Sequence, residues 1–195
     1  MFYEGKVDAE RICTSSMLEK IRPTSDDRDS YTEVPGDWDF ALIDTRSREE
    51  YEQAHINGAV NMPKDGAFLE DILPDDKDKQ LIFYGTECYD WMYEAKEAGY
   101  ENLYLYDADI EGWKARADYL TTTPQYVSEL IAEENISDKD RPHYVLIDTR
   151  GFGMYFESHI PTAQSMPHTI FEDKYLDYLP ADKETEIITY CGGFF

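Results

Sequence analysis

The sequence has few basic residues, few cysteines and no long apolar run. Its 195 residues contain 18 Lys and Arg against 42 Asp and Glu, which gives a formal net charge of -24. An electrostatic field of that sign repels phosphate backbones and anionic membrane surfaces, so we expect neither nucleic acid nor a membrane as a partner. No stretch approaches the roughly 20 apolar residues that a membrane span needs.

The three cysteines, Cys13, Cys88 and Cys191, stand in three different sequence contexts. They are too few and too scattered for a disulfide framework or a zinc site, and the sequence implies no metal and no cofactor. The first ten residues, MFYEGKVDAE, are acidic and lack the apolar segment of a signal peptide. We therefore expect a cytoplasmic protein, with a periplasmic or exported protein whose signal has been removed as the alternative.

The sequence contains an internal repeat. The segment FALIDTRSREEYEQAHINGAVNMP begins at Phe40, and the segment YVLIDTRGFGMYFESHIPTAQSMP begins at Tyr144. A repeat of this length is too long for a solenoid and indicates two domains of one fold. We expect the first domain at residues 1–118 and the second at residues 119–195.

Each repeat alternates apolar runs with helical patterns. The runs at 40–43, 80–84, 144–147 and 186–190 are short and continuous, which is typical of parallel strands buried on both faces. Helices are predicted from the capping box Ser16-x-x-Glu19, from Thr123-Pro124 and at 90–98. This alternation predicts an α/β fold in which each domain is a short parallel sheet with helices on both faces.

The second repeat is shorter than the first. After Gly85 the first repeat continues through a predicted helix, a strand at 102–106 and the segment DIEGW, whereas only four residues follow Cys191. A sheet that loses a strand and a covering helix exposes an edge and apolar surface. We therefore expect the second domain to be incomplete at its C-terminal end, because the chain is a fragment or because a partner chain supplies the rest.

The pattern LIDTR…YxxxHIxGAxNMP resembles the rhodanese-like sulfurtransferase family, and the segment AGYENLYLYDADIEGW is similar to the end of such a domain. The resemblance covers nearly the whole chain and implies a tandem of rhodanese-like domains, the first degenerate and the second catalytic. In TYCGGFF, Cys191 stands where the family carries sulfur on its active-site loop. The residues that we expect to bind the substrate are Gly192, Gly193, Phe194, Phe195 and Arg150.

The chemistry of sulfur transfer requires a thiolate at such a place. A cysteine at the carboxyl end of a parallel strand faces converging backbone N–H groups, which favour the thiolate and an anionic sulfur species. Gly192 and Gly193 permit the backbone turn that directs those groups inward. The alternative interpretation of Cys191 is a structural one, in which its side chain packs as a small buried apolar group at a strand end.

The first repeat lacks this nucleophile, because Gly85 occupies the position of Cys191. Cys88 lies three residues further on, and Glu87 and Asp90 repel an anionic substrate. We therefore predict a catalytically inactive first domain, and we interpret Cys13 as structural.

Other polar residues occur in both repeats, which favours structural roles for them. We interpret each Asp-x-Arg as a buried ion pair at a strand end, with a carboxylate such as Glu50 or Glu157 as the partner of the arginine. His55 and His159 are interpreted as structural hydrogen-bonding residues. His168 has no histidine counterpart in the first repeat, where Lys64 occupies the aligned position. It is a candidate to line the pocket of the second domain.

The sequence thus predicts an enzyme that moves sulfane sulfur through a Cys191 persulfide. The donor is thiosulfate, a polysulfide or a persulfide, and the acceptor is cyanide, a small thiol or a protein thiol. The resemblance implies that thiosulfate is the less favoured donor, because family members that use it tend to carry a further arginine a few residues after Asp-x-Arg. In this sequence residues 151–154 contain no base. The alternatives are a non-catalytic module for binding or sulfide sensing, and a phosphatase or arsenate reductase on a related fold.

Overall fold

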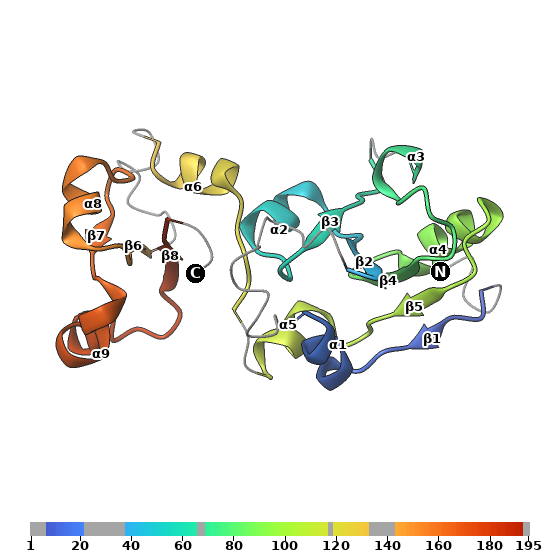
Figure 1. Cartoon of the computed structure of the whole chain (residues 1–195), viewed down its shortest axis with the longest axis horizontal. Helices are drawn as coiled ribbons and strands as arrows, with labels where there is room; N and C mark the ends of the chain where they lie inside the picture. The colour runs from blue at the N-terminus through green and yellow to red at the C-terminus, as the bar shows by residue number, and fades with distance from the viewer. Residues whose placement is uncertain (1–6, 22–37, 66–68, 117–118, 133–142, 193–195) are drawn as a thin grey trace. The chain divides into compact units, whose positions relative to one another are not determined.

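The computed structural model describes residues 7–21, 38–65, 69–116, 119–132 and 143–192 (Figure 1). The chain divides into two compact units, residues 1–126 and 127–195, and each unit is described by itself. Residue 118, the predicted end of the first domain, lies outside the described residues. None of the helices in the described ranges is long and apolar enough to cross a membrane.

The first unit is built on a five-stranded parallel sheet with the strand order β1-β5-β4-β2-β3. Its strands are β1 (Glu10–Arg11), β2 (Phe40–Asp44), β3 (Ala59–Asn61), β4 (Gln80–Tyr84) and β5 (Leu103–Leu105). Its helices are α1 (Thr14–Ile21), α2 (Arg48–Gln53), α3 (Leu69–Ile72), α4 (Cys88–Glu97) and α5 (Asp109–Lys114). The predicted α/β fold with a parallel sheet is confirmed.

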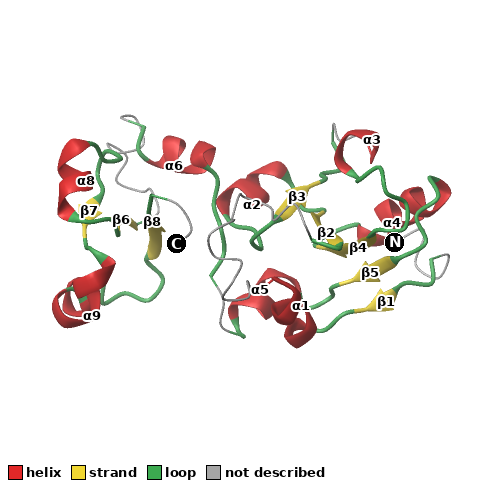
Figure 2. Cartoon of the chain, viewed as in Figure 1, coloured by secondary structure: helices red, strands yellow, loops and turns green. Residues whose placement is uncertain are grey.

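Both faces of this sheet are buried, which explains its continuous apolar strands (Figure 2). In β4, Leu81 and Phe83 point into a core shared with α3 and α4. The alternate residues Ile82 and Tyr84 point into a second core, shared with α1 and α5. Because successive side chains of a strand point to opposite faces, a strand between two cores needs apolar residues throughout.

Helix α1 begins earlier than its sequence predicts. It starts at Thr14, so that Ser16 lies inside the first turn and is not the N-cap residue. The Thr14 side chain is buried, and its hydroxyl lies 3.0 Å from the hydroxyl of Tyr106. This tertiary hydrogen bond fixes the beginning of the helix, which the local capping pattern does not reveal.

The second unit contains a three-stranded parallel sheet with the order β7-β6-β8. Its strands are β6 (Tyr144–Asp148), β7 (Gln164–Ser165) and β8 (Glu186–Tyr190). Its helical segments are α8 (Phe152–Glu157), α9 (Phe171–Lys174) and the 3-10 turns η2 (His168–Ile170) and η3 (Leu176–Tyr178), with α6 (Pro124–Leu130) crossing from the first unit. Within the described part of this unit, no element corresponds to α4 or β5, so β8 has a neighbour on one side only.

Candidate active site

The carboxyl ends of β6 and β8 lie side by side, and Cys191 follows directly after β8. Asp148 and Tyr190 are partners in the parallel register of these strands. The carbonyl oxygen of Tyr190 accepts two hydrogen bonds from Thr149, one from its backbone N–H at 3.0 Å and one from its hydroxyl at 2.9 Å. Cys191 therefore leaves the sheet from a fixed point, and its side chain is exposed.

Of the residues predicted to bind the substrate, the structure describes Arg150 and Gly192. Gly192 is exposed beside Cys191, whereas Gly193, Phe194 and Phe195 lie outside the described residues. Arg150 belongs to the same edge of the sheet as Cys191, two residues after β6 ends. The residues that the sequence assigns to the site thus include one cation and one thiol at neighbouring strand ends.

Arg150 is held by a network that uses most of its hydrogen-bonding capacity. Its Nε donates to Asp148 Oδ1 at 2.9 Å, and its Nη2 donates to Asp148 Oδ2 at 2.6 Å. Nη2 also donates to the carbonyl oxygen of Ser158 at 2.6 Å. The Asp148 side chain is fully buried, and its hydrogen bonds with Arg150 lower the pKa of its carboxyl group. Such a bidentate pair fixes both orientation and charge.

The guanidinium of Arg150 also lies over the aromatic ring of Tyr190, with its central carbon 5.4 Å from the ring centroid. The hydroxyl of Tyr190 accepts a hydrogen bond from the backbone N–H of Ile160 at 3.0 Å. Burial raises the pKa of this tyrosine, so the hydroxyl is neutral at ordinary pH. The residue immediately before Cys191 is therefore fixed by its backbone, its ring and its hydroxyl.

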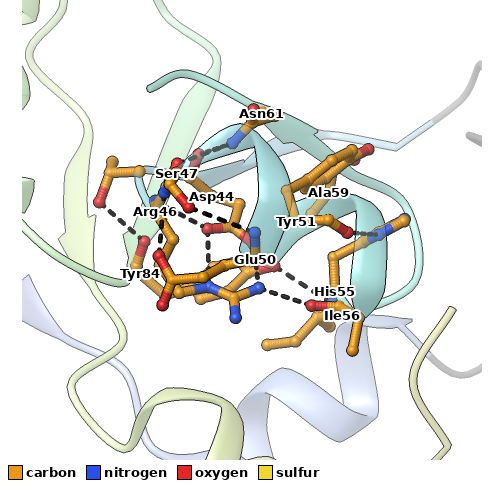
Figure 3. Close-up of polar contacts among 12 residues, drawn as sticks. Asp44, Arg46, Ser47, Glu50, Tyr51, His55, Ile56, Ala59, Asn61 and Tyr84 are labelled. Atoms are coloured by element: carbon orange, nitrogen blue, oxygen red, sulfur yellow. Dashed lines mark hydrogen bonds and ion pairs between the residues drawn. The ribbon is translucent and has the colours of Figure 1, made fainter. Parts of the chain in front are cut away.

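The first unit contains the same network, drawn in Figure 3. Arg46 donates from Nε to Asp44 at 3.0 Å and from Nη2 to Asp44 at 2.6 Å, and it lies over Tyr84. The predicted ion pair is present in both units, but its carboxylate belongs to the aspartate of the motif itself. Glu50 instead completes a capping box with Ser47 at the start of α2.

The histidines of the two repeats make matching contacts. The Nδ1 atom of His55 lies 2.8 Å from the carbonyl oxygen of Tyr51, and that of His159 lies 2.9 Å from the carbonyl oxygen of Tyr155. Each imidazole stacks on its tyrosine with ring centroids 3.9 Å apart. These contacts orient the end of a helix in each unit and fit a structural role.

His168 lies at the same strand ends as the Tyr190 carbonyl. Its backbone N–H donates to the carbonyl oxygen of Thr149 at 3.1 Å, and its Nδ1 lies 3.2 Å from the same oxygen. Its counterpart Lys64 in the first unit forms ion pairs with Glu87 and Asp90, on the loop and helix that follow β4. In the first unit this position thus lies beside the residues that follow β4, and the role of His168 in lining a pocket of the second domain stays a prediction.

The backbone of the first unit excludes a cysteine at the matching position. Gly85 has a φ of 103°, a conformation that residues with a side chain rarely adopt. A Cβ atom placed there would lie 2.7 Å from Cγ of Arg46 and 3.2 Å from Oγ1 of Thr45. The glycine is therefore required by the conformation of this loop as well as by the space around it.

Cys88 does not replace the missing nucleophile. Its side chain is buried in the core of the first unit, and its Sγ lies 3.4 Å from Oγ1 of Thr45. Burial raises the pKa of its thiol to about 11, so the reactive thiolate is almost absent at neutral pH.

Cys13, which the sequence interpretation treats as structural, has a surface environment that lowers the pKa of its thiol. It is exposed, immediately before α1, and its Sγ lies 3.1 Å from Oγ of Ser15 and 3.4 Å from Oγ of Ser16. These hydroxyl groups lower the pKa of the Cys13 thiol to about 6. The serine pair that follows this cysteine in CTSS was the sequence signal for such an environment.

The model for the rhodanese-like domain matches residues 28–116 and again residues 123–194. The chain therefore belongs to the rhodanese-like domain family. One curated relative, the tRNA uridine(34) hydroxylase of Erwinia tasmaniensis, is 30% identical over 89 residues, which are 42% of this chain and 25% of the relative. The chain thus spans about a quarter of the length of that protein.

The chain is also similar to several solved structures. The 3-mercaptopyruvate sulfotransferase SseA from Escherichia coli is 18% identical with a TM-score of 0.40, over 93% of this chain and 87% of that chain. A thiosulfate sulfurtransferase from Pseudomonas aeruginosa is 19% identical with a TM-score of 0.39, over 95% of this chain and 36% of that chain.

Replacing Asp148 with Asn tests the ion pair. The pKa of Asp148 is lowered in the folded chain, so its contribution to stability is complete above the unfolded value of about 3.9 and is lost as the pH falls through the folded value. We expect Asp148→Asn to lower the free energy of unfolding of the second unit by about 2 kcal/mol at pH 7. Urea denaturation across pH 2–7 checks this, and a difference that stays constant down to pH 2 would contradict it.

Replacing Gly85 with Cys tests why the first repeat has a glycine at the position that corresponds to Cys191. We expect Gly85→Cys to lower the free energy of unfolding by about 3 kcal/mol, because a positive φ and a steric clash both oppose the new side chain. Gly99→Cys is the matched control, since Gly99 has a φ of 96° but open space around it. Its expected cost is about 1 kcal/mol. Equal costs in chemical denaturation would contradict the role of the clash.

The cysteines are expected to differ in reactivity. At pH 7 in the native chain, iodoacetamide should modify Cys13 well before Cys88, because Cys13 is exposed with a lowered pKa, whereas Cys88 is buried with a raised pKa. Peptide mass spectrometry after short exposures measures the order. Replacing Ser15 and Ser16 with Ala should slow the modification of Cys13. Modification of Cys88 first would contradict the assignment.

Proposed function

We propose that the chain is a sulfurtransferase that carries sulfur on Cys191. The observation that supports this is the position of Cys191, an exposed thiol directly after β8 beside the ion pair of Asp148 and Arg150. Membership of the rhodanese-like domain family supports the same chemistry at the level of the family.

The reaction consists of two displacements at sulfur. In the first, the Cys191 thiolate attacks the outer sulfur of the donor, a new S–S bond forms, and the donor group leaves with the electron pair of its own S–S bond. In the second, a thiolate or cyanide attacks the outer sulfur of the persulfide, and the Cys191 thiolate leaves. The sulfane sulfur is only transferred, so the cycle needs no added oxidant or reductant.

We propose a polysulfide or a persulfide as the donor in preference to thiosulfate. A sulfonate group binds best to an unpaired cation, whereas the charge of Arg150 is paired with Asp148 and its Nε and Nη2 donate to Asp148 and Ser158, so that only Nη1 is left for a ligand. Residues 151–154 have the sequence GFGM and supply no second base. Cyanide, a small thiol or a protein thiol is the proposed acceptor.

In this proposal the first unit provides a scaffold without chemistry of its own. Gly85 occupies the position of the nucleophile, and the buried thiol of Cys88 has a raised pKa. Lys64 bridges Glu87 and Asp90 on the segment that would face a substrate, which leaves carboxylates where an anion would bind. An anionic sulfur donor is repelled by such a site.

The hydroxylase relative raises the question of tRNA as a substrate. A formal net charge of -24 opposes binding to a polyanion, because affinity for nucleic acid depends on cationic contacts with phosphates. We therefore do not propose an RNA substrate. The three cysteines, none in a disulfide, support our placement of the protein in a reducing compartment such as the cytoplasm.

Intact mass spectrometry tests the proposal. After incubation with polysulfide, and in a separate arm with thiosulfate, we expect a gain of about 32 Da for one persulfide sulfur. Because Cys13 has a lowered pKa, the measurement uses the Cys13→Ser chain, with Cys13→Ser/Cys191→Ala as the matched control. The gain should be absent from the control and reversed by cyanide. If neither donor adds mass to the Cys13→Ser chain, the sulfurtransferase proposal fails and a binding role is favoured.

A further inference from the structure

His168 and Lys64 occupy the same place in the two units. Each follows the end of its strand, β7 or β3, by three residues. The strands have the same register, because the last residue of β7 pairs with Asp148 as the last residue of β3 pairs with Asp44. The change from lysine to histidine is therefore made at one place of a shared backbone, and it replaces a cation with a group that can accept a proton.

The imidazole of His168 is oriented by a single carbonyl group. The carbonyl oxygen of Thr149 lies 3.1 Å from the backbone nitrogen of His168 and 3.2 Å from its Nδ1 atom. A carbonyl oxygen accepts hydrogen bonds and cannot donate them, so Nδ1 carries the proton in this contact. The neutral ring therefore has its lone pair on Nε2, which is the nitrogen that can accept a proton.

Thr149 connects this ring to the strand that precedes Cys191. Its backbone N–H and its hydroxyl both donate to the carbonyl oxygen of Tyr190, at 3.0 and 2.9 Å. In the sheet order β7-β6-β8, Thr149 follows the central strand, and His168 and Cys191 follow the two strands beside it. The imidazole and the thiol thus belong to the same edge of one sheet, and a single threonine connects the segments that carry them.

The first unit shows which segment a side chain at this place reaches. The Nζ atom of Lys64 lies 3.1 Å from Oε1 of Glu87 and 3.3 Å from Oδ2 of Asp90. Both carboxylates belong to the segment that begins at Gly85, the counterpart of Cys191. In this fold, a side chain at the position of His168 therefore reaches the segment that starts with the residue at the position of the nucleophile.

We propose that His168 is a catalytic residue whose Nε2 accepts the proton of an acceptor thiol. This role rests on the proposed function, in which a Cys191 persulfide passes its outer sulfur to an acceptor. Nε2 takes the proton of R–SH, the resulting thiolate forms a bond to the outer sulfur, and the S–S bond to Cys191 breaks with its electron pair on Cys191. The imidazolium then gives the proton to the transferred sulfur. The products are R–S–SH and the Cys191 thiolate, without net oxidation or reduction.

The charge of the chain favours an acceptor that arrives as a neutral thiol. A formal net charge of -24 repels thiolates, whereas it does not repel an uncharged R–SH. A thiol with an ordinary pKa of about 8.5 is almost fully protonated at pH 7, so it is a weak nucleophile until a base removes its proton. In this proposal His168 supplies that base, and the acceptor is an uncharged thiol of a small molecule or of a protein.

The transfer step is measured on a chain that already carries the sulfur. The Cys13→Ser chain is loaded with polysulfide and freed of excess donor, and intact mass spectrometry follows the loss of about 32 Da after 2-mercaptoethanol is added at pH 7. The test variant His168→Asn keeps an N–H group that can donate to Thr149 but has no base. Its rate with the thiol should be at least about tenfold lower. His168→Lys, which introduces the residue of the first repeat, should show a similar loss.

A second acceptor separates proton transfer from a structural role. Sulfite attacks the outer sulfur as a dianion, which has no proton to give up, so the His168 variants should change its rate by less than about twofold. His143→Asn is the matched control, because His143 precedes β6 and lies at the opposite edge of the same sheet. It should leave the rates with both acceptors unchanged.

The outcomes distinguish this role from the proposed function. If the parent chain takes up no sulfur from polysulfide, the proposed function fails, and the role of His168 fails with it. If the parent chain and the variants take up sulfur but transfer it to the thiol at the same rate, only the role of His168 is overturned. It is also overturned if the variants slow transfer to the thiol and to sulfite equally, because the side chain then only maintains the structure.

Discussion

The ion pair within each Asp-x-Arg motif is the interaction on which the rest of each unit depends. The carboxylates of Asp44 and Asp148 are fully removed from solvent, and a buried charge is costly unless it is paired and hydrogen-bonded. In the second unit Arg150 pairs with Asp148. It also donates a hydrogen bond to the carbonyl oxygen of Ser158 and lies over the ring of Tyr190. One guanidinium thus connects the end of β6, the end of α8 and the residue before Cys191.

Both units share this ion pair, but they differ in the backbone conformation of the residue that follows the strand beside it. The residue after β4 is a glycine with positive φ, whereas the residue after β8 is Cys191, which is not among the non-glycine residues with positive φ. The chain therefore leaves the two sheets along different paths, although the strands before it are in the same register with their neighbours. The glycine in the first unit is required by the whole loop, because the surrounding side chains of Thr45 and Arg46 occupy the space of a Cβ atom.

The sequence was sufficient for the parts that local pattern determines. The apolar runs predicted strands at 40–43 and 186–190, and the structure has them at Phe40–Asp44 and Glu186–Tyr190, since strands between two cores need uninterrupted apolar residues. The sequence was insufficient where a contact with a residue distant in the chain determines the start of a helix or the exposure of a side chain. The beginning of α1 depends on Tyr106, and neither the exposure of Cys13 nor that of Phe156 can be read from periodicity. The motif aspartate was overlooked as the partner of its own arginine because the two are only two residues apart.

The same ion pair limits what Arg150 contributes to the proposed chemistry. A guanidinium paired with a carboxylate is close to neutral as a unit, so it offers little field to attract a doubly charged anion toward Cys191. The surrounding charge of -24 acts in the opposite direction and repels such anions more strongly than it repels neutral or singly charged sulfur species. At physiological ionic strength this repulsion is screened beyond about 8 Å, which leaves the nearest groups to decide the choice of donor. In the reaction proposed for Cys191, the electrostatics of the described residues therefore favour donors of low charge over doubly charged anions.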